Sequence, residues 1–364
     1  MRFGSVMKKI LDKWLGRYFS NEEAVLVAVM LASFMILTAT VGEYLGPAFT
    51  ALIIAFLLQG VVNALVRIGA SQRMSVILTF FLFLVGLVTI LVGLVPLVGR
   101  QMTLLLSEAP DILGRLQVFL NGLPARYADY VTAEQFEMIW LRVSEEIGNI
   151  AEQVLSFSFS SFPSLFAIGI YLLLVPVLVF FMLHDRETLV RFVTNLLPKK
   201  RPVMTSIWSE MNIQFANYVR GKAIEILIVG LLSYAVFLFM GLNYAALLAL
   251  LVGLSVLIPY IGATVVTFPV LVVAYMQWGY SSEFFWLFIV YGAIQIFDGN
   301  VLVPLLFSEV VNLHPIAIIV AVLLFGGIWG FWGVFFAIPL ATFVKAVFNA
   351  WPDSSLAELD STVD

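Results

Sequence analysis

Long apolar runs separated by short polar segments dominate the pattern of this chain. Six of these runs contain 18 or more residues, namely 24–41, 48–66, 76–98, 162–183, 223–240 and 284–307. A helix needs about 20 apolar residues to cross a hydrocarbon core of roughly 30 Å. Each run therefore predicts a membrane-spanning helix.

Two further apolar stretches follow the last two runs, and each is broken near its centre. The first break is Ile258-Pro259-Tyr260-Ile261-Gly262, and the second is the glycine-rich segment from Gly326 to Gly333. Arms of roughly 14 to 16 residues are short for full crossings, which favours re-entrant helical hairpins. Ordinary spans with proline kinks are the alternative. The predicted fold is an all-α polytopic membrane protein of about eight hydrophobic segments, with six full spans and two re-entrant hairpins.

The C-terminal half also contains an internal repeat. Ala223-Ile224-Glu225-Ile226 recurs as Ala293-Ile294-Gln295-Ile296, an offset of 70 residues that also aligns Pro269 with Pro339. The same offset aligns Tyr244-Ala245 with His314-Pro315. One span plus one re-entrant hairpin reverses the orientation of the next unit, so the two units are expected to form an inverted repeat, as in many transporters.

These patterns divide the chain into eight regions. We expect a cytoplasmic amphipathic helix (1–22), a scaffold of three spans (23–98), an external polar helical segment (99–161), a fourth span (162–183), a cytoplasmic loop with an interfacial helix (184–222), repeat 1 (223–277), repeat 2 (278–347) and a disordered cytoplasmic tail (348–364). An apolar stripe over 136–154 in the external segment packs either within the subunit or against another subunit.

Composition and charge agree with a membrane protein of defined orientation. The chain is 62% hydrophobic and 12% charged, whereas soluble domains are roughly 45–50% apolar and about 25% charged. Basic residues concentrate in the N-terminus, in the loop containing Arg67 and Arg73, and in 184–222, which predicts that these segments are cytoplasmic. Membrane lipid is therefore a partner, both termini are expected in the cytoplasm, and the cytoplasmic membrane is the expected location. No nucleic-acid partner is expected.

Asp298 is the strongest candidate for a functional residue. It lies within an apolar run, and no lysine or arginine occurs between Lys222 and Lys345. Such a carboxylate must be neutral or paired with a group distant in sequence, and ionisable groups at this depth often mark ion or proton paths. Gln295 and Asn300 lie nearby and supply oxygen ligands that suit a hard cation. A protonated Asp298 held by their hydrogen bonds is the structural alternative.

The other candidates are weaker. Glu225 aligns with Gln295 in the repeat but lies close to Arg220 and Lys222, which favours a structural ion pair. His314 precedes a proline and either senses pH near neutrality or caps a helix. The remaining candidates lie at the two breaks, where backbone groups are expected to line a substrate path, and comprise Pro259, Tyr260, Gly262, Gly327 and Gly330.

Several classes of function have no support in the sequence. The chain has no cysteine, two histidines and no His-Glu-x-x-His motif, which argues against a metalloenzyme or a thiol enzyme. It also lacks the Gly-x-x-x-x-Gly-Lys-Ser/Thr loop of ATP-driven pumps. We expect no enzyme activity, no cofactor and no metal. The expected function is secondary transport, with a passive channel or an assembly protein for envelope partners as the alternatives.

Several motifs together resemble a known family. They are Tyr218-Val219-Arg220-Gly221-Lys222, Ile258-Pro259-Tyr260-Ile261-Gly262, Gln295 with Asp298 and Asn300, His314-Pro315, and Gly326 to Gly333 ahead of Pro339. The pattern resembles the autoinducer exporter-like family, also called the PerM-like permeases, over nearly the whole chain. Lys222 stands where many of that family carry glutamine, and Ala263 where proline is usual.

The resemblance implies specific properties. Members are described as exporters of a small quorum-sensing signal, and others as sodium or lithium/proton antiporters. It implies a small-molecule or cation substrate, a homo-oligomer with a pentamer reported for a relative, and an elevator-like movement of the hairpin domain. The residues do not identify the substrate.

Overall fold

The computed structural model describes residues 29–30, 33, 36, 40–42, 44–121, 138, 141–142, 145, 162–195, 197, 202–307 and 313–350. The predicted amphipathic helix at 1–22, most of the first span, most of the external segment beyond residue 121 and the tail beyond residue 350 lie outside these residues. Every regular element within the described residues is a helix.

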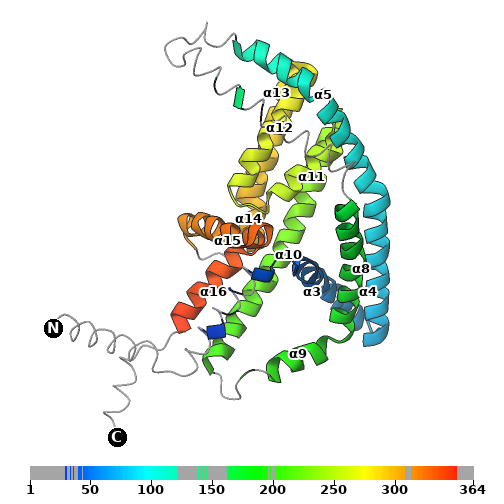
Figure 1. Ribbon diagram of the computed structural model, residues 1–364, viewed down its shortest axis with the longest axis vertical. Coiled ribbons are helices and arrows are strands. Elements are labelled where there is room, and N and C mark those ends of the chain that lie inside the picture. The colour runs from blue at the N-terminus through cyan, green and yellow to red at the C-terminus, as the bar shows by residue number, and fades with distance from the viewer. Residues whose placement is uncertain are drawn as a thin grey trace, which may run out of the picture.

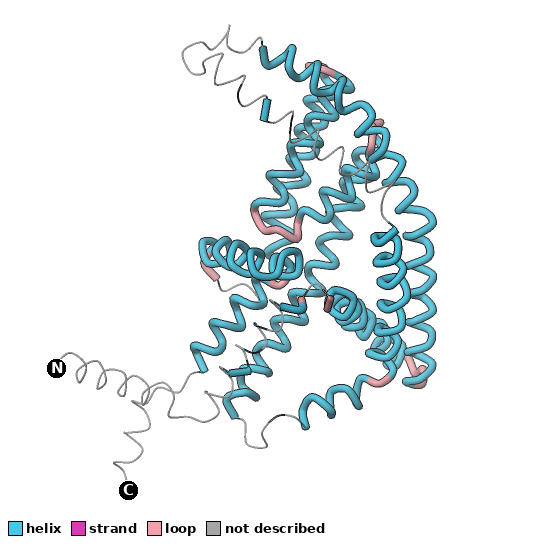
Figure 2. Tube along the Cα trace, in the orientation of Figure 1, coloured by secondary structure: helices cyan, strands magenta, loops and turns pink. Residues whose placement is uncertain are grey.

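The helices form an elongated assembly in which α10 runs through the middle (Figures 1 and 2). The elements are α3 (Gly46–Arg67), α4 (Gln72–Thr89), the π-helix η1 (Ile90–Leu94), α5 (Val95–Asn121), α8 (Phe162–His184), α9 (Arg186–Asn195), α10 (Pro202–Phe239), α11 (Ala245–Ser255), α12 (Ile261–Trp278), α13 (Ser282–Phe297), the π-helix η2 (Asp298–Leu302), α14 (Val303–Phe307), α15 (Pro315–Phe335) and α16 (Ala337–Ala350).

The predicted all-α polytopic fold is confirmed. Six helices in the described part of the chain are long and apolar enough to cross a membrane, and a seventh span results if α8 and α9, bent by 80°, count as one. The re-entrant character of the two broken stretches and their inverted orientation stay predictions.

Two helices extend beyond the predicted boundaries. The α4–η1–α5 helix continues through residue 98, where we placed the end of the third span, and reaches Asn121. Helix α10 has 38 residues and is about 57 Å long at 1.5 Å per residue. It passes residue 222 without interruption, so the predicted interfacial helix and the span after it form one helix.

Both π-helical segments lie just before a proline. Proline lacks an N–H group, so Pro96 cannot bond to the Val92 carbonyl, and Pro304 cannot bond to the Asn300 carbonyl. The segments η1 and η2 contain these two carbonyls and widen the helix locally. A π-segment is a common way to accommodate such a break and is frequent at functional sites.

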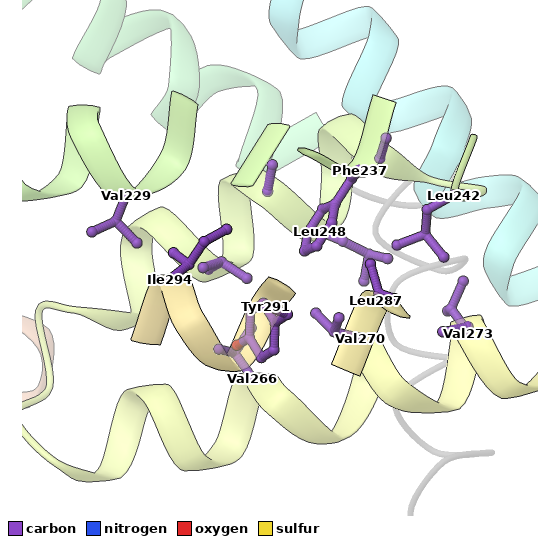
Figure 3. Close-up of a cluster of buried hydrophobic side chains, with 14 of the residues drawn as sticks. Val229, Phe237, Leu242, Leu248, Val266, Val270, Val273, Leu287, Tyr291 and Ile294 are labelled. Carbon is purple, nitrogen blue, oxygen red and sulfur yellow. The ribbon is translucent and has the colours of Figure 1, made fainter. Parts of the chain in front are cut away.

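The apolar side chains form two main cores on different helices. The larger core joins α10, α11, α12 and α13 through residues such as Phe237, Leu248, Val270 and Leu287 (Figure 3). The second joins α3, α4 and α8, with the buried residues Ala51, Ala55, Val62, Val76, Val175, Val179 and Leu183. The predicted scaffold and the predicted repeats therefore each have a core of their own.

Apolar, polar and aromatic contacts connect the two groups of helices. Ile53, Phe56 and Leu57 of α3 pack against a cluster that contains Tyr218 and Val219 of α10. The Leu247 amide of α11 donates a hydrogen bond to Oε1 of Gln101 on α5, at 2.8 Å. Close by, burial and a hydrogen bond with Glu108 raise the pKa of Tyr244 to about 12. Phe49 of α3 packs against Trp329, with ring centroids 5.6 Å apart.

Candidate ion-coupling site

Three polar side chains lie along one stripe of α10. Tyr218, Lys222 and Glu225 follow at intervals of four and three residues, which places them on the same helix face. All three are buried, with 1%, 5% and 2% of their surface exposed. Lysine and glutamate are rarely buried so completely unless they are paired, so this stripe marks the centre of the site.

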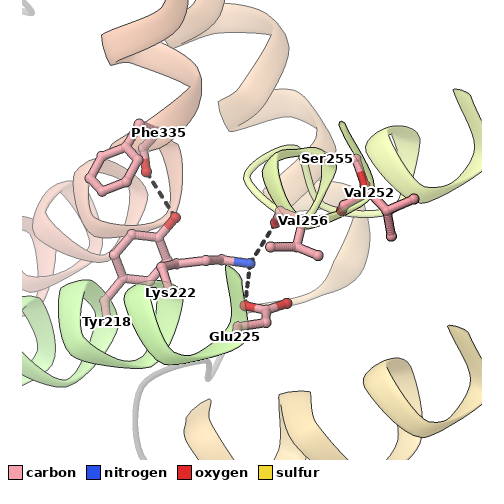
Figure 4. A network of polar contacts seen from close by, with 7 residues as sticks. All are labelled: Tyr218, Lys222, Glu225, Val252, Ser255, Val256 and Phe335. Atoms are coloured by element: carbon pink, nitrogen blue, oxygen red, sulfur yellow. Dashed lines mark hydrogen bonds and ion pairs between the residues drawn. The ribbon is translucent and has the colours of Figure 1, made fainter. Parts of the chain in front are cut away.

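The stripe contacts the break in the first hairpin. We call residues 256–260, between α11 and α12, the first tip. The Lys222 ammonium donates a hydrogen bond to the carbonyl of Val256 in this tip, at 2.7 Å (Figure 4). Val256 is the C-cap of α11, and carbonyls at a helix C-terminus lack intrahelical partners and attract cations. Pro259 has no backbone N–H group, so it cannot donate a hydrogen bond to a carbonyl of this tip.

The same stripe contacts the break in the second hairpin. We call residues 330–336 the second tip. The Tyr218 hydroxyl donates a hydrogen bond to the Phe335 carbonyl at 2.8 Å (Figure 4). In a continuous helix this carbonyl would accept from residue 339, but Pro339 has no N–H. Leu257 of the first tip packs with Phe335, so both tips meet beside α10.

The site holds one cation and two carboxylates. Lys222 Nζ lies 2.8 Å from Oε2 of Glu225. Asp298, the first residue of η2, is 9% exposed and interacts electrostatically with both Lys222 and Glu225. Its Oδ1 atom is buried and has no hydrogen-bond partner among the described residues. With both carboxylates ionised, the site carries one uncompensated negative charge.

Lys222 is the basic residue that interacts with Asp298. The sequence required a neutral carboxyl or a basic group distant in the chain, and the structure places Lys222 within electrostatic range. The Lys222 ammonium also lies 5.1 Å from the ring centroid of Phe307, on α14, which adds a cation–π contact. Among the described residues, no group of three or more His, Cys, Asp or Glu side chains could hold a metal ion.

Asn300 and Gln295 are the other residues that the sequence predicts as ligands near Asp298. Asn300 is exposed, and its amide donates to the Ile296 carbonyl at 2.9 Å. Gln295 is half-buried on α13, next to the buried Ile294. A direct role for these two residues in ion binding stays a prediction.

The candidates at the first tip shape its backbone. Tyr260 is 58% exposed and has a φ of 64°. Gly262 is buried, and a Cβ atom there would overlap the Ser255 carbonyl oxygen. Only glycine allows the two arms to approach this closely, so Pro259, Tyr260 and Gly262 shape the tip that holds the Val256 carbonyl.

The backbone of the second tip has features similar to those of the first tip. Gly330 has a φ of 58° and lies 70 residues after Tyr260, the offset found in the sequence. A Cβ atom at Gly333 would overlap the Phe325 carbonyl oxygen. Phe325 lies 70 residues after Ser255, whereas Gly333 lies 71 residues after Gly262. Gly327 is exposed, and a Cβ atom there would meet nothing within 4 Å.

His314 is the N-cap of α15. Its Nδ1 accepts a hydrogen bond from the Ile316 amide at 3.3 Å, and Pro315 is the first residue of the helix. This is the helix-cap role that the sequence analysis left open beside pH sensing. The corresponding residue in the first repeat, Tyr244, is the N-cap of α11.

Sequence reasoning missed two contributors. Lys222 lies at the end of the predicted cytoplasmic loop, but its side chain is buried, is paired with Glu225 and interacts electrostatically with Asp298. Tyr218 was noticed only as part of a motif. The available clue was spacing, because Tyr218, Lys222 and Glu225 share one helix face. The accepting carbonyls of Val256 and Phe335 belong to the backbone, so no side chain in the sequence identifies them.

The chain is similar to a family of transporters and to proteins that are described as permeases or transport proteins. The model of a family described as AI-2E family transporter matches residues 24–353. A protein of Escherichia coli (strain K12) described as the permease PerM is 43% identical over 97% of this chain and 100% of its own length. A protein of Bacillus subtilis (strain 168) described as the transport protein YueF is 26% identical over 84% of this chain and 84% of its own length.

Proposed function

Because this chain belongs to the AI-2E family of transporters, we propose that it is a secondary transporter that exports a small solute across the cytoplasmic membrane in exchange for a proton or a monovalent cation. The observation that carries the proposal is the charge of the buried site. Lys222 compensates one of two carboxylates, which leaves a charge that one proton or one monovalent cation can neutralise. Binding and release of that charge at Asp298 is the proposed coupling step.

An elevator-like movement is part of this proposal. The core of α10 to α13 and the core of α3, α4 and α8 consist of different residues, which supports movement of the hairpins and their spans against the scaffold. Such a movement would slide α3 over the cluster that its Ile53, Phe56 and Leu57 share with α10. Packed cores move as units because their interiors do not deform continuously. The polar contact between Gln101 and Leu247 and the aromatic contact between Phe49 and Trp329 are among those that such a movement would rearrange.

We also propose that the protein is a homo-oligomer with both termini in the cytoplasm. The distribution of basic residues supports this orientation. Large apolar side chains of α4 are exposed, including Ile77, Phe81 and Val85. Such a surface suits lipid or a second subunit.

The test is cation-dependent proton flux in proteoliposomes. The parent protein, Asp298→Asn and the control Glu283→Gln are compared, because Glu283 is an exposed carboxylate at the start of the same helix. We expect flux in the parent and the control and none in Asp298→Asn. Flux that persists in Asp298→Asn would refute coupling at this carboxyl group. Absence of flux from the parent would refute ion coupling and favour uncoupled transport of an organic solute, a passive channel or an assembly role.

A further inference from the structure

The surroundings of the Lys222 ammonium resemble the ligands of a bound cation. Two oxygen atoms contact it, the Glu225 carboxylate at 2.8 Å and the Val256 carbonyl at 2.7 Å. The Phe307 ring lies on a further side, with its centroid 5.1 Å away. A carboxylate and a backbone carbonyl are also the ligands that hard alkali cations take in proteins.

We propose that Lys222 is a tethered cation that occupies a buried monovalent-cation site formed by Glu225 and Val256. The proposal deepens the proposed function and rests on it for its role in transport, since it determines which positive charges the protein exchanges. With Lys222 in place, a free cation is excluded from this position, and only the charge of Asp298 remains for exchange. Lys222 thus determines the ion specificity and the stoichiometry of coupling.

Charge compensation supports this interpretation. Asp298 Oδ1 is buried without a hydrogen-bond partner among the residues described, and Asp298 interacts electrostatically with Lys222. An oxygen atom that could accept a further hydrogen bond or bind a cation therefore lies within electrostatic range of the ammonium group. Without Lys222, Glu225 and Asp298 would be two buried negative charges with no cation in direct contact. An isolated buried charge is strongly unfavourable, so the two carboxylates would have to bind protons or recruit a cation from solution.

The tethered cation also joins the first tip to the coupling site. The ammonium group binds the Val256 carbonyl of the first tip and the Glu225 carboxylate of α10 at the same time. A change of charge at Asp298 therefore alters the electric field at Lys222. Through Lys222 it also affects the hydrogen bond to the Val256 carbonyl in the first tip. This linkage gives ion binding a direct route to the hairpin backbone.

Thermal unfolding in detergent micelles tests the proposal without any transport assay. The parent protein and Lys222→Gln are heated in sodium, lithium, potassium or choline chloride at constant ionic strength. Glutamine has no charge and adds an amide oxygen, which suits a free cation. We expect the midpoint of Lys222→Gln to rise with the concentration of one alkali cation more steeply than the midpoint of the parent, because a ligand that binds only the folded state stabilises it.

Three matched variants make the test specific. Lys222→Gln/Glu225→Gln should lose the additional cation response, because a ligand of the site is removed. Lys222→Arg retains a tethered charge and should respond like the parent. Arg220→Gln removes an exposed cation from the same helix and should also respond like the parent.

Three results would overturn the proposal. They are equal cation responses in the parent and Lys222→Gln, persistence of the additional response in the double variant, and failure of Lys222→Gln to fold in any alkali cation. The outcome is separate from that of the flux experiment. A parent without proton flux combined with an additional response in Lys222→Gln would refute coupling while supporting the cation site.

Discussion

The buried ion pair between Lys222 and Glu225 allows the loss of stability in Lys222→Met to be predicted. Methionine keeps most of the volume of the side chain and removes its charge. The side chains of the pair are 6% and 2% exposed, and their charged atoms are 2.8 Å apart. At an effective dielectric constant of about 20, two unit charges at this distance attract by roughly 6 kcal/mol. Desolvation of both ions offsets much of this energy.

Removal of one partner leaves the other without compensation. The free energy of unfolding of Lys222→Met should therefore fall by about 3–5 kcal/mol, the usual range for a broken buried pair. Arg220→Met is the control, since Arg220 is exposed on the same helix. It should change the free energy of unfolding by no more than about 1 kcal/mol.

A double-mutant cycle in mixed micelles gives the required measurement. Lys222→Met, Glu225→Met and the double variant are unfolded with a denaturing detergent, and their free energies are compared with that of the parent. The double variant should be more stable than either single variant, because replacement of a buried pair by apolar groups is often neutral. A loss below about 1 kcal/mol for Lys222→Met, as exposed pairs show, would refute the reasoning. A double variant less stable than both single variants would do the same.

Three further predictions concern the tips and the unpaired carboxyl group. Tyr218→Phe leaves the buried Phe335 carbonyl without its donor and should lower the free energy of unfolding by about 1–3 kcal/mol, and an unchanged value would contradict this hydrogen bond. Gly262→Ala places a Cβ atom against the Ser255 carbonyl oxygen and should lower the unfolding midpoint. Gly292→Ala is the control, because a Cβ atom there meets nothing within 4 Å, and it should leave the midpoint unchanged or raise it. Asp298→Asn should unfold at the same temperature as the parent or higher, because its Oδ1 has no hydrogen-bond partner in the described chain; a large decrease would indicate a structural role.

Structural features that depend only on residues adjacent in the sequence were predicted correctly. Apolar runs long enough to cross a bilayer predicted an all-α polytopic fold. Pro259 and the glycines from Gly326 to Gly333 predicted breaks, and the structure has a loop between α11 and α12 and a kink at Gly330. These outcomes follow from local properties, namely side-chain hydrophobicity, the missing N–H of proline and the conformational freedom of glycine.

The charge pattern did not reveal that Lys222 is buried. Lys222 and the residues before it were read as a cytoplasmic loop because basic residues favour that side of the membrane. Helix α10 instead continues through Lys222 and buries it. Basic residues in loops predict which side of the membrane a segment faces. An individual lysine can nevertheless lie inside the protein when it pairs with a buried carboxylate, as Lys222 does with Glu225.

The sequence by itself therefore determined the all-α membrane fold, the two breaks and the isolation of Asp298 among apolar residues. Only the tertiary structure decided which groups form the buried polar site on α10. Lys222 is distant in sequence, and the carbonyls of Val256 and Phe335 become available only because two helices end beside α10. Charge interactions and hydrogen bonds depend on distance in space, and the folding of the hairpins against α10 sets those distances.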